Sequence, residues 1–185
     1  GDEISIALRA PQIPEGQLLA EQERWRFGAA SGGRAVFGEL DEPAELIETL
    51  SGRPVVVHDA KALGVVPDVL AHDTLLAAYL LEPSRRGFPL AELCEERGLV
   101  IDAPDELAAA AALTEALCAA QRGQLEERGL TALLQDIELP LVPVLRRMEL
   151  EGVRLNQEKL AAIRVRVADE VADLERQIHR IAGHE

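Results

Sequence analysis

The stretch from Asp136 to Leu160 constrains the fold most, because it carries the start and end signals of two successive helices. Pro140 and Pro143 have no backbone N–H, so they suit the first turn of a helix, where that donor would have no partner. Gly152 accepts the left-handed conformation that ends a helix, and Asn156 is a favourable N-cap for the next one. The pattern predicts two helices joined by a short extended link.

Apolar side chains recur at three- and four-residue steps in both predicted helices. Those of the first helix form one apolar face, with Arg146 and Arg147 on the far side. The second helix, Gln157–Ala182, would be about 39 Å long at 1.5 Å per residue. Little chain remains to cover its apolar seam, so we expect the seam to pack against another domain. The apolar face of the first helix is Leu141, Val144, Leu145 and Met148, and the seam is Leu160, Ile163, Val167, Val171, Leu174, Ile178 and Ile181.

A mixed α/β domain is predicted before this stretch, because strand patterns alternate with helix patterns. The expected strands are Ile4–Ala10, the two arms of a hairpin around Ser31-Gly32-Gly33, and the β-branched run Pro54–His58, with a short strand or turn at Leu18–Ala20. The expected helices are Ala44–Leu50 with Asp41 as N-cap, Thr74–Leu81, Pro89–Arg97, and the alanine-rich segment Pro104–Arg128, for which Gly123 offers a break.

The charge balance excludes a main DNA-binding surface, since phosphate binding depends on cationic side chains. The chain has 19 Lys and Arg against 33 Asp and Glu, a net charge of -14, and only 3% aromatic residues for stacking on bases. Cys94 and Cys118 lack metal-site spacing and are expected to be reduced, buried thiols. We expect no membrane contact and a cytoplasmic protein, because neither a signal peptide nor a membrane-spanning run is present.

The run ELPLVPVLRRMELEGVRLN, residues 138–156, resembles the junction between the 3′–5′ exonuclease-type domain and the polymerase domain of family A DNA polymerases. Asp73–Pro83 and Ile181–Glu185 resemble two further landmarks of that family. The resemblance implies a ribonuclease-H-like exonuclease fold for residues 1–135, and the junction helix plus the first polymerase helix for 136–185. It also implies template-directed DNA synthesis with Mg²⁺ by a monomeric parent protein. The polymerase domain of the same chain would be the partner of this segment, and the parent protein would bind the DNA.

Active members of that family hold two metal ions with acidic side chains from three motifs, and all three look degenerate here. The first motif aligns its carboxylates with Ala7 and Arg9. The second aligns His58–Leu63 so that Leu63 takes the place of an aspartate. The third places an alanine, one of Ala108–Ala112, at the remaining aspartate. The resemblance therefore implies an inactive nuclease site, with no metal and no cofactor in this segment. Asp59 is a weak candidate for a rescue ligand.

Other polar residues are more simply explained by structure than by chemistry. Asp73 is expected to cap the helix Thr74–Leu81 rather than to act in catalysis. His58 and His72 lack a partnered nucleophile and are expected to be hydrogen-bonded structural histidines. His179 lies on a polar helix side and His184 near the chain end. The compact basic pairs are Arg85 with Arg86 and Arg146 with Arg147, for which solvated surface and phosphate contact both stay open.

Three functions therefore stay open. The first is a structural, exonuclease-like domain of a DNA polymerase. The second is a working 3′–5′ exonuclease with displaced carboxylates, for which Asp59, Asp68 and Asp73 are the candidates. The third is an unrelated acidic α/β interaction module whose likeness to polymerases is accidental.

Overall fold

The computed structural model describes residues 2–11 and 24–183, so the predictions for Leu18–Ala20 and His184 lie outside the described residues. The chain forms two compact units, Gly1–Met148 and Glu149–Glu185. The predicted domain assignment, 1–135 and 136–185, refers to a larger protein and stays a prediction.

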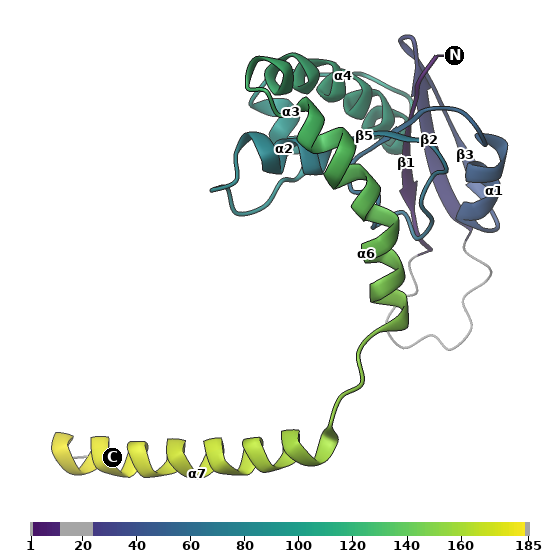
Figure 1. The fold of residues 1–185 in the computed structure, drawn as a ribbon. Helices are drawn as coiled ribbons and strands as arrows, with labels where there is room; N and C mark the ends of the chain where they lie inside the picture. Colours follow the sequence, from purple (N-terminus) through teal and green to yellow (C-terminus); the bar gives the residue numbers. More distant parts are fainter. Residues whose placement is uncertain (1, 12–23, 184–185) are drawn as a thin grey trace. The chain divides into compact units, whose positions relative to one another are not determined.

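The first unit is built on a mixed sheet of five strands in the order β3-β2-β1-β4-β5 (Figure 1). β1 pairs antiparallel with β2 and parallel with β4, and β4 pairs parallel with β5. The α/β class with a mixed sheet is thus confirmed. The strands are β1 (Ile4–Arg9), β2 (Trp25–Ser31), β3 (Arg34–Leu40), β4 (Val55–Val57) and β5 (Leu70–Asp73).

The predicted hairpin and the predicted buried strand are both present. β2 and β3 are joined by Gly32 and Gly33, whose φ angles of 59° and 76° suit a two-residue hairpin turn that few other residues adopt. Every residue of β4 is buried, as expected for a β-branched strand that is covered on both faces.

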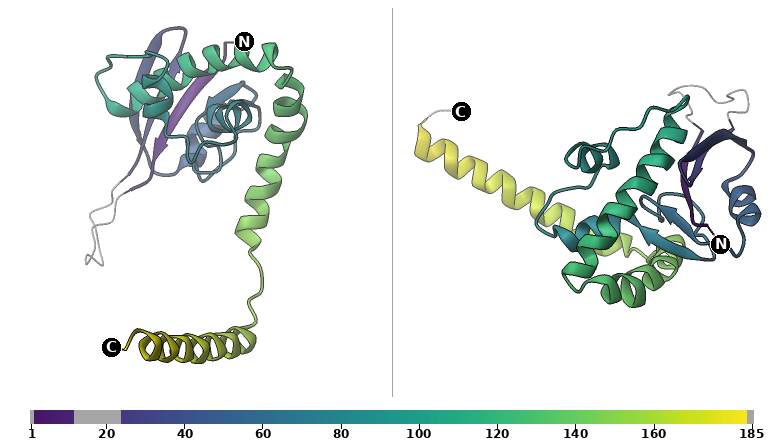
Figure 2. Two further views of the ribbon diagram at one scale, coloured as in Figure 1. Left: turned by 90° about the vertical axis from the view of Figure 1, so that its left-hand side faces the viewer. Right: turned by 90° about the horizontal axis from the view of Figure 1, so that it is seen from above.

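Helices cover both faces of this sheet. The helix α4 (Glu106–Glu127) lies across one face, where it contacts β1, β2, β3 and β4 (Figure 2). On the other face α1 (Pro43–Thr49) contributes Leu46 and Ile47 to an apolar cluster with Ile4 and Ile6. Two shorter helices, α2 (Thr74–Leu81) and α3 (Leu90–Glu95), pack beside α4.

The predicted α2 has the expected bounds, and the cysteines are free and buried as expected. Two predictions for other helices were wrong. α4 continues through Gly123 without a break. The N-cap of α1 is Glu42 rather than Asp41, because Glu45 accepts a hydrogen bond from the Glu42 N–H at 3.1 Å while Asp41 binds Arg24.

The junction helix begins earlier than the prolines suggested. A short helical turn, α5 (Thr131–Leu133), runs into a π-helical segment, η1 (Leu134–Glu138), and then into α6 (Leu139–Glu151). Pro143 therefore lies inside a helix and not in its first turn. Because a proline supplies no N–H and its ring crowds the carbonyl four residues earlier, the widened π turn just before Pro140 relieves a local conflict.

The predicted apolar face of α6 is not the face that is buried in the first unit. Leu139 and Val142 are buried there, whereas the four side chains of the predicted apolar face are 40–61% exposed. Arg146 lies on the buried side, where its Nη2 is 3.5 Å from the Gly64 carbonyl oxygen. The exposed set is Leu141, Val144, Leu145 and Met148.

The second unit consists mainly of α7 (Gln157–Ala182), whose bounds are those predicted. The Asn156 side chain caps it through the Lys159 N–H at 2.9 Å, and Gly183 ends it with a φ of 75°. No described residue of this helix is buried, so its apolar seam is not covered within its own unit.

Gly28 in β2 allows the closest approach between α4 and the sheet. A Cβ atom built on Gly28 would lie 2.0 Å from the Leu107 carbonyl oxygen and 2.6 Å from the Ala108 nitrogen. Both are backbone atoms, so a side chain here would force α4 away from the sheet. The glycine sets the spacing of these two layers.

We expect Gly28→Ala to lower the free energy of unfolding by about 2 kcal/mol or more, because the added methyl overpacks a backbone contact. Gly123→Ala is the matched control, since Gly123 lies in α4 and has open space around it. That control should gain about 0.5–1 kcal/mol from better helix propensity. Urea unfolding of both variants measures this, and a loss below about 0.5 kcal/mol for Gly28→Ala would contradict the close-contact argument.

Candidate functional site

The two positions predicted for the first motif lie on the sheet face that α4 covers. Ala7 is the cross-strand partner of Gly28, and Arg9 is the partner of Arg26. Side chains alternate along a strand, so Ala7 and Arg9 point to the same face as Ser5, which lines a cavity with residues of α4. Ala7 places only a methyl group on this face.

The third motif lies directly opposite, in the first half of α4. Ala108 and Ala111 are completely buried, and Ala108 adjoins Gly28. The structure therefore brings the first and third predicted positions together, but as a tight contact of small residues. A contact of this kind offers neither the oxygen ligands nor the room that a pair of metal ions needs.

Four charged side chains meet at the edge of this contact. Arg9 and Arg26 both pair with Glu106, and Arg26 also pairs with Asp105, the N-cap of α4. The hydrogen bond from Arg9 lowers the pKa of the Glu106 carboxyl below its ordinary value. Arg9, one of the two positions predicted for the first motif, thus binds a carboxylate.

The second predicted position is not part of this contact. Leu63 is only 5% exposed and lies in the apolar cluster that contains Ile4 and Ile6. Those two strand residues point away from the α4 face, because they alternate with Ser5 and Ala7. The three predicted motif positions therefore do not converge on one point.

Asp73 is a structural residue, as its predicted role as helix cap requires. Its buried carboxylate accepts hydrogen bonds from four backbone N–H groups, at 2.7–3.3 Å. Two belong to the first turn of α2 and two to the loop after β4. The donors are Asp59, Ala60, Leu75 and Leu76.

The two inner histidines form hydrogen bonds with buried polar groups, as expected. His72 Nε2 lies 3.1 Å from Gln121 Oε1, and Gln121 in turn donates to the Thr74 carbonyl oxygen at 2.8 Å. His58 Nδ1 lies 2.8 Å from the Thr74 hydroxyl, which donates to the Val57 carbonyl oxygen. Burial lowers the pKa of both imidazoles, so both are neutral near pH 7.

The candidate rescue ligands are used elsewhere. Asp59 has a left-handed backbone with φ 64° and accepts from the Ala62 N–H, while Asp68 accepts from the Ser51 hydroxyl. Asp59, Asp73 and Glu138 line a cavity of only about 50 Å³. Within residues 2–11 and 24–183, no three His, Cys, Asp or Glu side chains lie where they could hold one metal ion.

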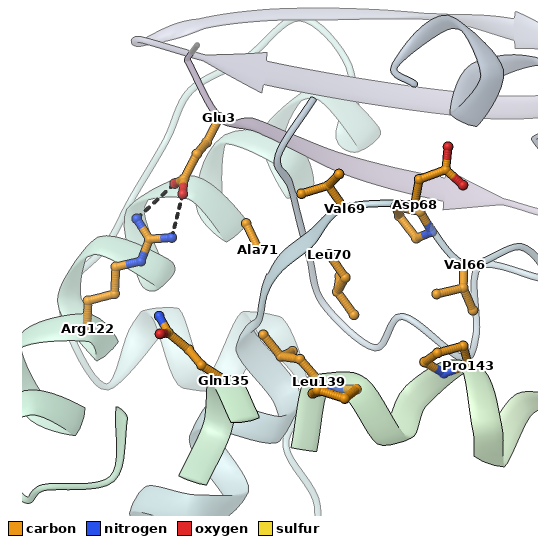
Figure 3. Close-up of a pocket in the computed structure, with 12 residues that line it drawn as sticks. Glu3, Val66, Asp68, Val69, Leu70, Ala71, Arg122, Gln135, Leu139 and Pro143 are labelled. Atoms are coloured by element: carbon orange, nitrogen blue, oxygen red, sulfur yellow. Dashed lines mark hydrogen bonds and ion pairs between the residues drawn. The ribbon is translucent and has the colours of Figure 1, made fainter. Parts of the chain in front are cut away.

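A groove of about 720 Å³ lies between β5 and the start of α6 in the first unit (Figure 3). Its middle is apolar, formed by Leu70, Leu139 and Pro143. One end carries the ion pair of Glu3 and Arg122, with two contacts of 2.7 and 2.8 Å. The groove contains no paired nucleophile and base, so its shape alone assigns it no chemistry.

The basic pairs differ in their surroundings. Arg85 binds Glu92 and Glu96 at 2.7–3.0 Å, so its charge is already balanced, whereas Arg86 is exposed. Arg146 contacts the Gly64 carbonyl, and Arg147 is exposed on α6. Phosphate contact by any of the four stays a prediction. None of the described helices is long and apolar enough to cross a membrane.

Known proteins resemble this chain in both sequence and fold. It is 36% identical over 175 residues to the thermostable DNA polymerase I of Thermus aquaticus, which covers 85% of this chain and 19% of that protein. It is 32% identical over 145 residues to DNA polymerase I of Deinococcus radiodurans, covering 75% of this chain and 15% of that protein. Mycobacterium tuberculosis DNA polymerase I is 27% identical over 78% of this chain and 18% of its own length. No protein-family model matches the chain.

The chain belongs to the bacterial DNA polymerase I family. The resemblance of residues 138–156 to that family is confirmed, and the alternative of an unrelated acidic module was wrong. A solved structure titled "POL domain of Pol1 from M. smegmatis complex with DNA primer-template and dNTP" has a TM-score of 0.69 and 23% identity, over 86% of this chain and 31% of that chain. That likeness concerns the fold. This chain spans about a fifth of the length of its DNA polymerase I relatives.

The motif patterns did not point to Gly28, Arg26, Asp105 or Glu106, which build the contact around Ala7. A glycine within a strand is a signal of close backbone approach, so Gly28 could have been singled out. The charged residues carried no such signal, because ordinary ion pairs leave no local spacing pattern.

Acidification from pH 7.5 to 5.5 is expected to destabilise the chain through His58 and His72. Both pKa values are lowered in the folded state, so the unfolded chain takes up protons first as the pH falls. The stability that the neutral rings contribute is complete above the ordinary histidine pKa of about 6.5. It is lost below that pH by at most about 1.4 kcal/mol per pH unit and histidine.

Urea unfolding at several pH values tests this, with His72→Gln as the comparison. The variant should show a shallower pH dependence between pH 6.5 and 5.5. Equal slopes for the wild type and the variant would contradict the role assigned to His72.

Proposed function

We propose that this chain is a ribonuclease-H-like, exonuclease-like domain of a cytoplasmic DNA polymerase I, with the start of the polymerase domain attached, and that it has no nuclease activity of its own. The observation that carries the proposal is the tight contact between Gly28, the cross-strand partner of Ala7, and the backbone of Leu107 and Ala108 in α4. Small side chains and a helix backbone fill the place where the family pattern needs metal-binding carboxylates.

Two further motif positions, Leu63 and Arg9, support the same conclusion. Leu63 is an apolar core residue, and Arg9 brings a positive charge that would repel a divalent cation. A two-metal mechanism needs several carboxylates that converge to hold two metal ions about 4 Å apart. The acidic residues nearest to this place, Asp105 and Glu106, are paired with arginines instead.

In this proposal the segment acts as a scaffold for the polymerase domain of the same chain. The full protein would be a monomer that carries out template-directed DNA synthesis with Mg²⁺ in replication and repair, and would bind its DNA mainly outside this segment. The exposed apolar face of α6, formed by Leu141, Val144, Leu145 and Met148, is the surface that this scaffold offers from the first unit. A side-by-side row of apolar groups on a helix is expected to pack against a neighbour.

The absence of nuclease activity is tested with 3′-labelled single-stranded DNA. The purified chain should release no more nucleotides with Mg²⁺ or Mn²⁺ than with EDTA. The Ala7→Asp/Arg9→Glu variant should be equally inactive, because Leu63 and the alanines of α4 still provide no ligand. Metal-dependent release of nucleotides by the unmodified chain would refute the proposal.

The scaffold role is tested by Val144→Ser/Met148→Ser, made both in this chain and in the full-length protein. Both side chains are more than half exposed, so the stability of this chain should change by less than about 0.5 kcal/mol. The full-length protein should melt at a lower temperature, because the substituted face would be buried there. Val142→Ala is the control, since Val142 is buried in the first unit and should destabilise both proteins. Equal melting temperatures of the variant and the wild-type full-length protein would rule out this face as the docking surface.

A further inference from the structure

Two arginines stand side by side on the sheet face that α4 covers. Arg9 and Arg26 are direct partners in the antiparallel register of β1 and β2, where like charges destabilise the pairing. Glu106 accepts hydrogen bonds from both guanidinium groups, and Asp105 accepts one from Arg26. The four charges sum to zero, and they join the ends of two strands to the first turn of one helix.

The two halves of α4 are held in the fold by different means. In the first half, from Glu106 to Ala112, the buried side chains are Leu107 and two alanines. In the second half the buried side chains are larger, namely Thr114, Leu117, Cys118, Gln121 and Leu125. Stabilisation by burial grows with apolar area, so packing holds the first half less firmly than the second.

Asp105 links the charge cluster to the helix itself. Its Oδ1 caps α4 by accepting from the Leu107 N–H at 2.8 Å, while its Oδ2 binds Arg26. The side chain of Asp105 is only 10% exposed, so solvent screens its charge less than that of an ordinary surface residue. Loss of the arginine would leave the cap carboxylate without its counter-charge.

We propose that Arg9, Arg26, Asp105 and Glu106 form an electrostatic latch that holds the first half of α4 on the sheet. When the latch opens, this half loses its helical hydrogen bonds and detaches from β1 and β2, while the second half stays in the core. Local opening of this kind is a general property of folded proteins, and it begins where packing is weakest. The sheet face around Ala7 and Gly28 is covered or uncovered by this step. The latch does not depend on the proposed function.

Amide hydrogen exchange tests the latch in Arg26→Gln and Glu106→Gln variants of the chain. Amides 110–114 should exchange about three to ten times faster than in the wild type, because a network of ion pairs has been broken. Amides 118–125 should keep the wild-type rate. Arg24→Gln is the matched control, because Arg24 also forms an ion pair beside β2, but with Asp41 rather than with α4. It should leave both groups of amides unchanged.

A second arm uses the wild type in 1 M NaCl, which needs no substitution. Salt should speed exchange of amides 110–114 in the wild type, and should have a smaller effect in Arg26→Gln, where the latch is already broken. The latch is overturned if amides 110–114 keep their wild-type rate in both variants. It is also overturned if both halves of α4 accelerate together, since that would indicate global rather than local opening.

Discussion

The buried carboxylate of Asp73 is the interaction on which the arrangement of the sheet and its helices most depends. It holds the loop after β4 and the first turn of α2 together, through four backbone N–H groups that would otherwise lack partners. A buried charge is tolerated only when it is fully hydrogen-bonded, and here every donor is part of the main chain. The next residue, Thr74, extends this junction. Its hydroxyl is hydrogen-bonded to His58, and its carbonyl oxygen accepts a hydrogen bond from the Gln121 side chain of α4. One strand end, one loop and two helices are therefore fixed relative to each other by two consecutive residues.

Although the chain is acidic, its described part has no cluster of acids for metal binding, because these carboxylates already have partners within the protein. Asp73 serves the backbone, Asp105 and Glu106 serve two arginines, and Glu3 serves Arg122. The hydrogen bond from Arg122 lowers the pKa of Glu3, so that pair stays charged well below neutral pH. A net charge of -14 therefore does not by itself make a metal site, because affinity depends on several oxygens that converge without partners of their own.

The elements whose ends are defined by local chemistry could be predicted from the sequence. α2 and α7 have their predicted bounds, because Asp73, Asn156 and Gly183 act within one turn of their own helix. The buried face of α6 could not be predicted in this way. Its sequence offers two apolar stripes. Val142 is buried because it meets the cluster around Ile4 and Leu63, and Leu139 is buried because it meets a second cluster with Leu81 and Leu125. The candidate site was predicted as a loss of ligands, but not as a latch, since Arg26 and Glu106 are 80 residues apart.

The charge of Arg9 determines what the end of β1 can bind. A carboxylate at the end of β1 would face Glu106 and Asp105 across a short gap, and the repulsion between such like charges would have to be relieved by a bound cation or a proton. An arginine supplies the positive charge covalently, so the strand end and the helix start attract each other without any bound ion. The fold then keeps its electrostatic balance independently of metal, which supports the proposal that this domain serves as architecture. Building a metal site at the end of β1 would require more than one substitution, because the helix backbone at Ala108 lies directly against Gly28 of the sheet.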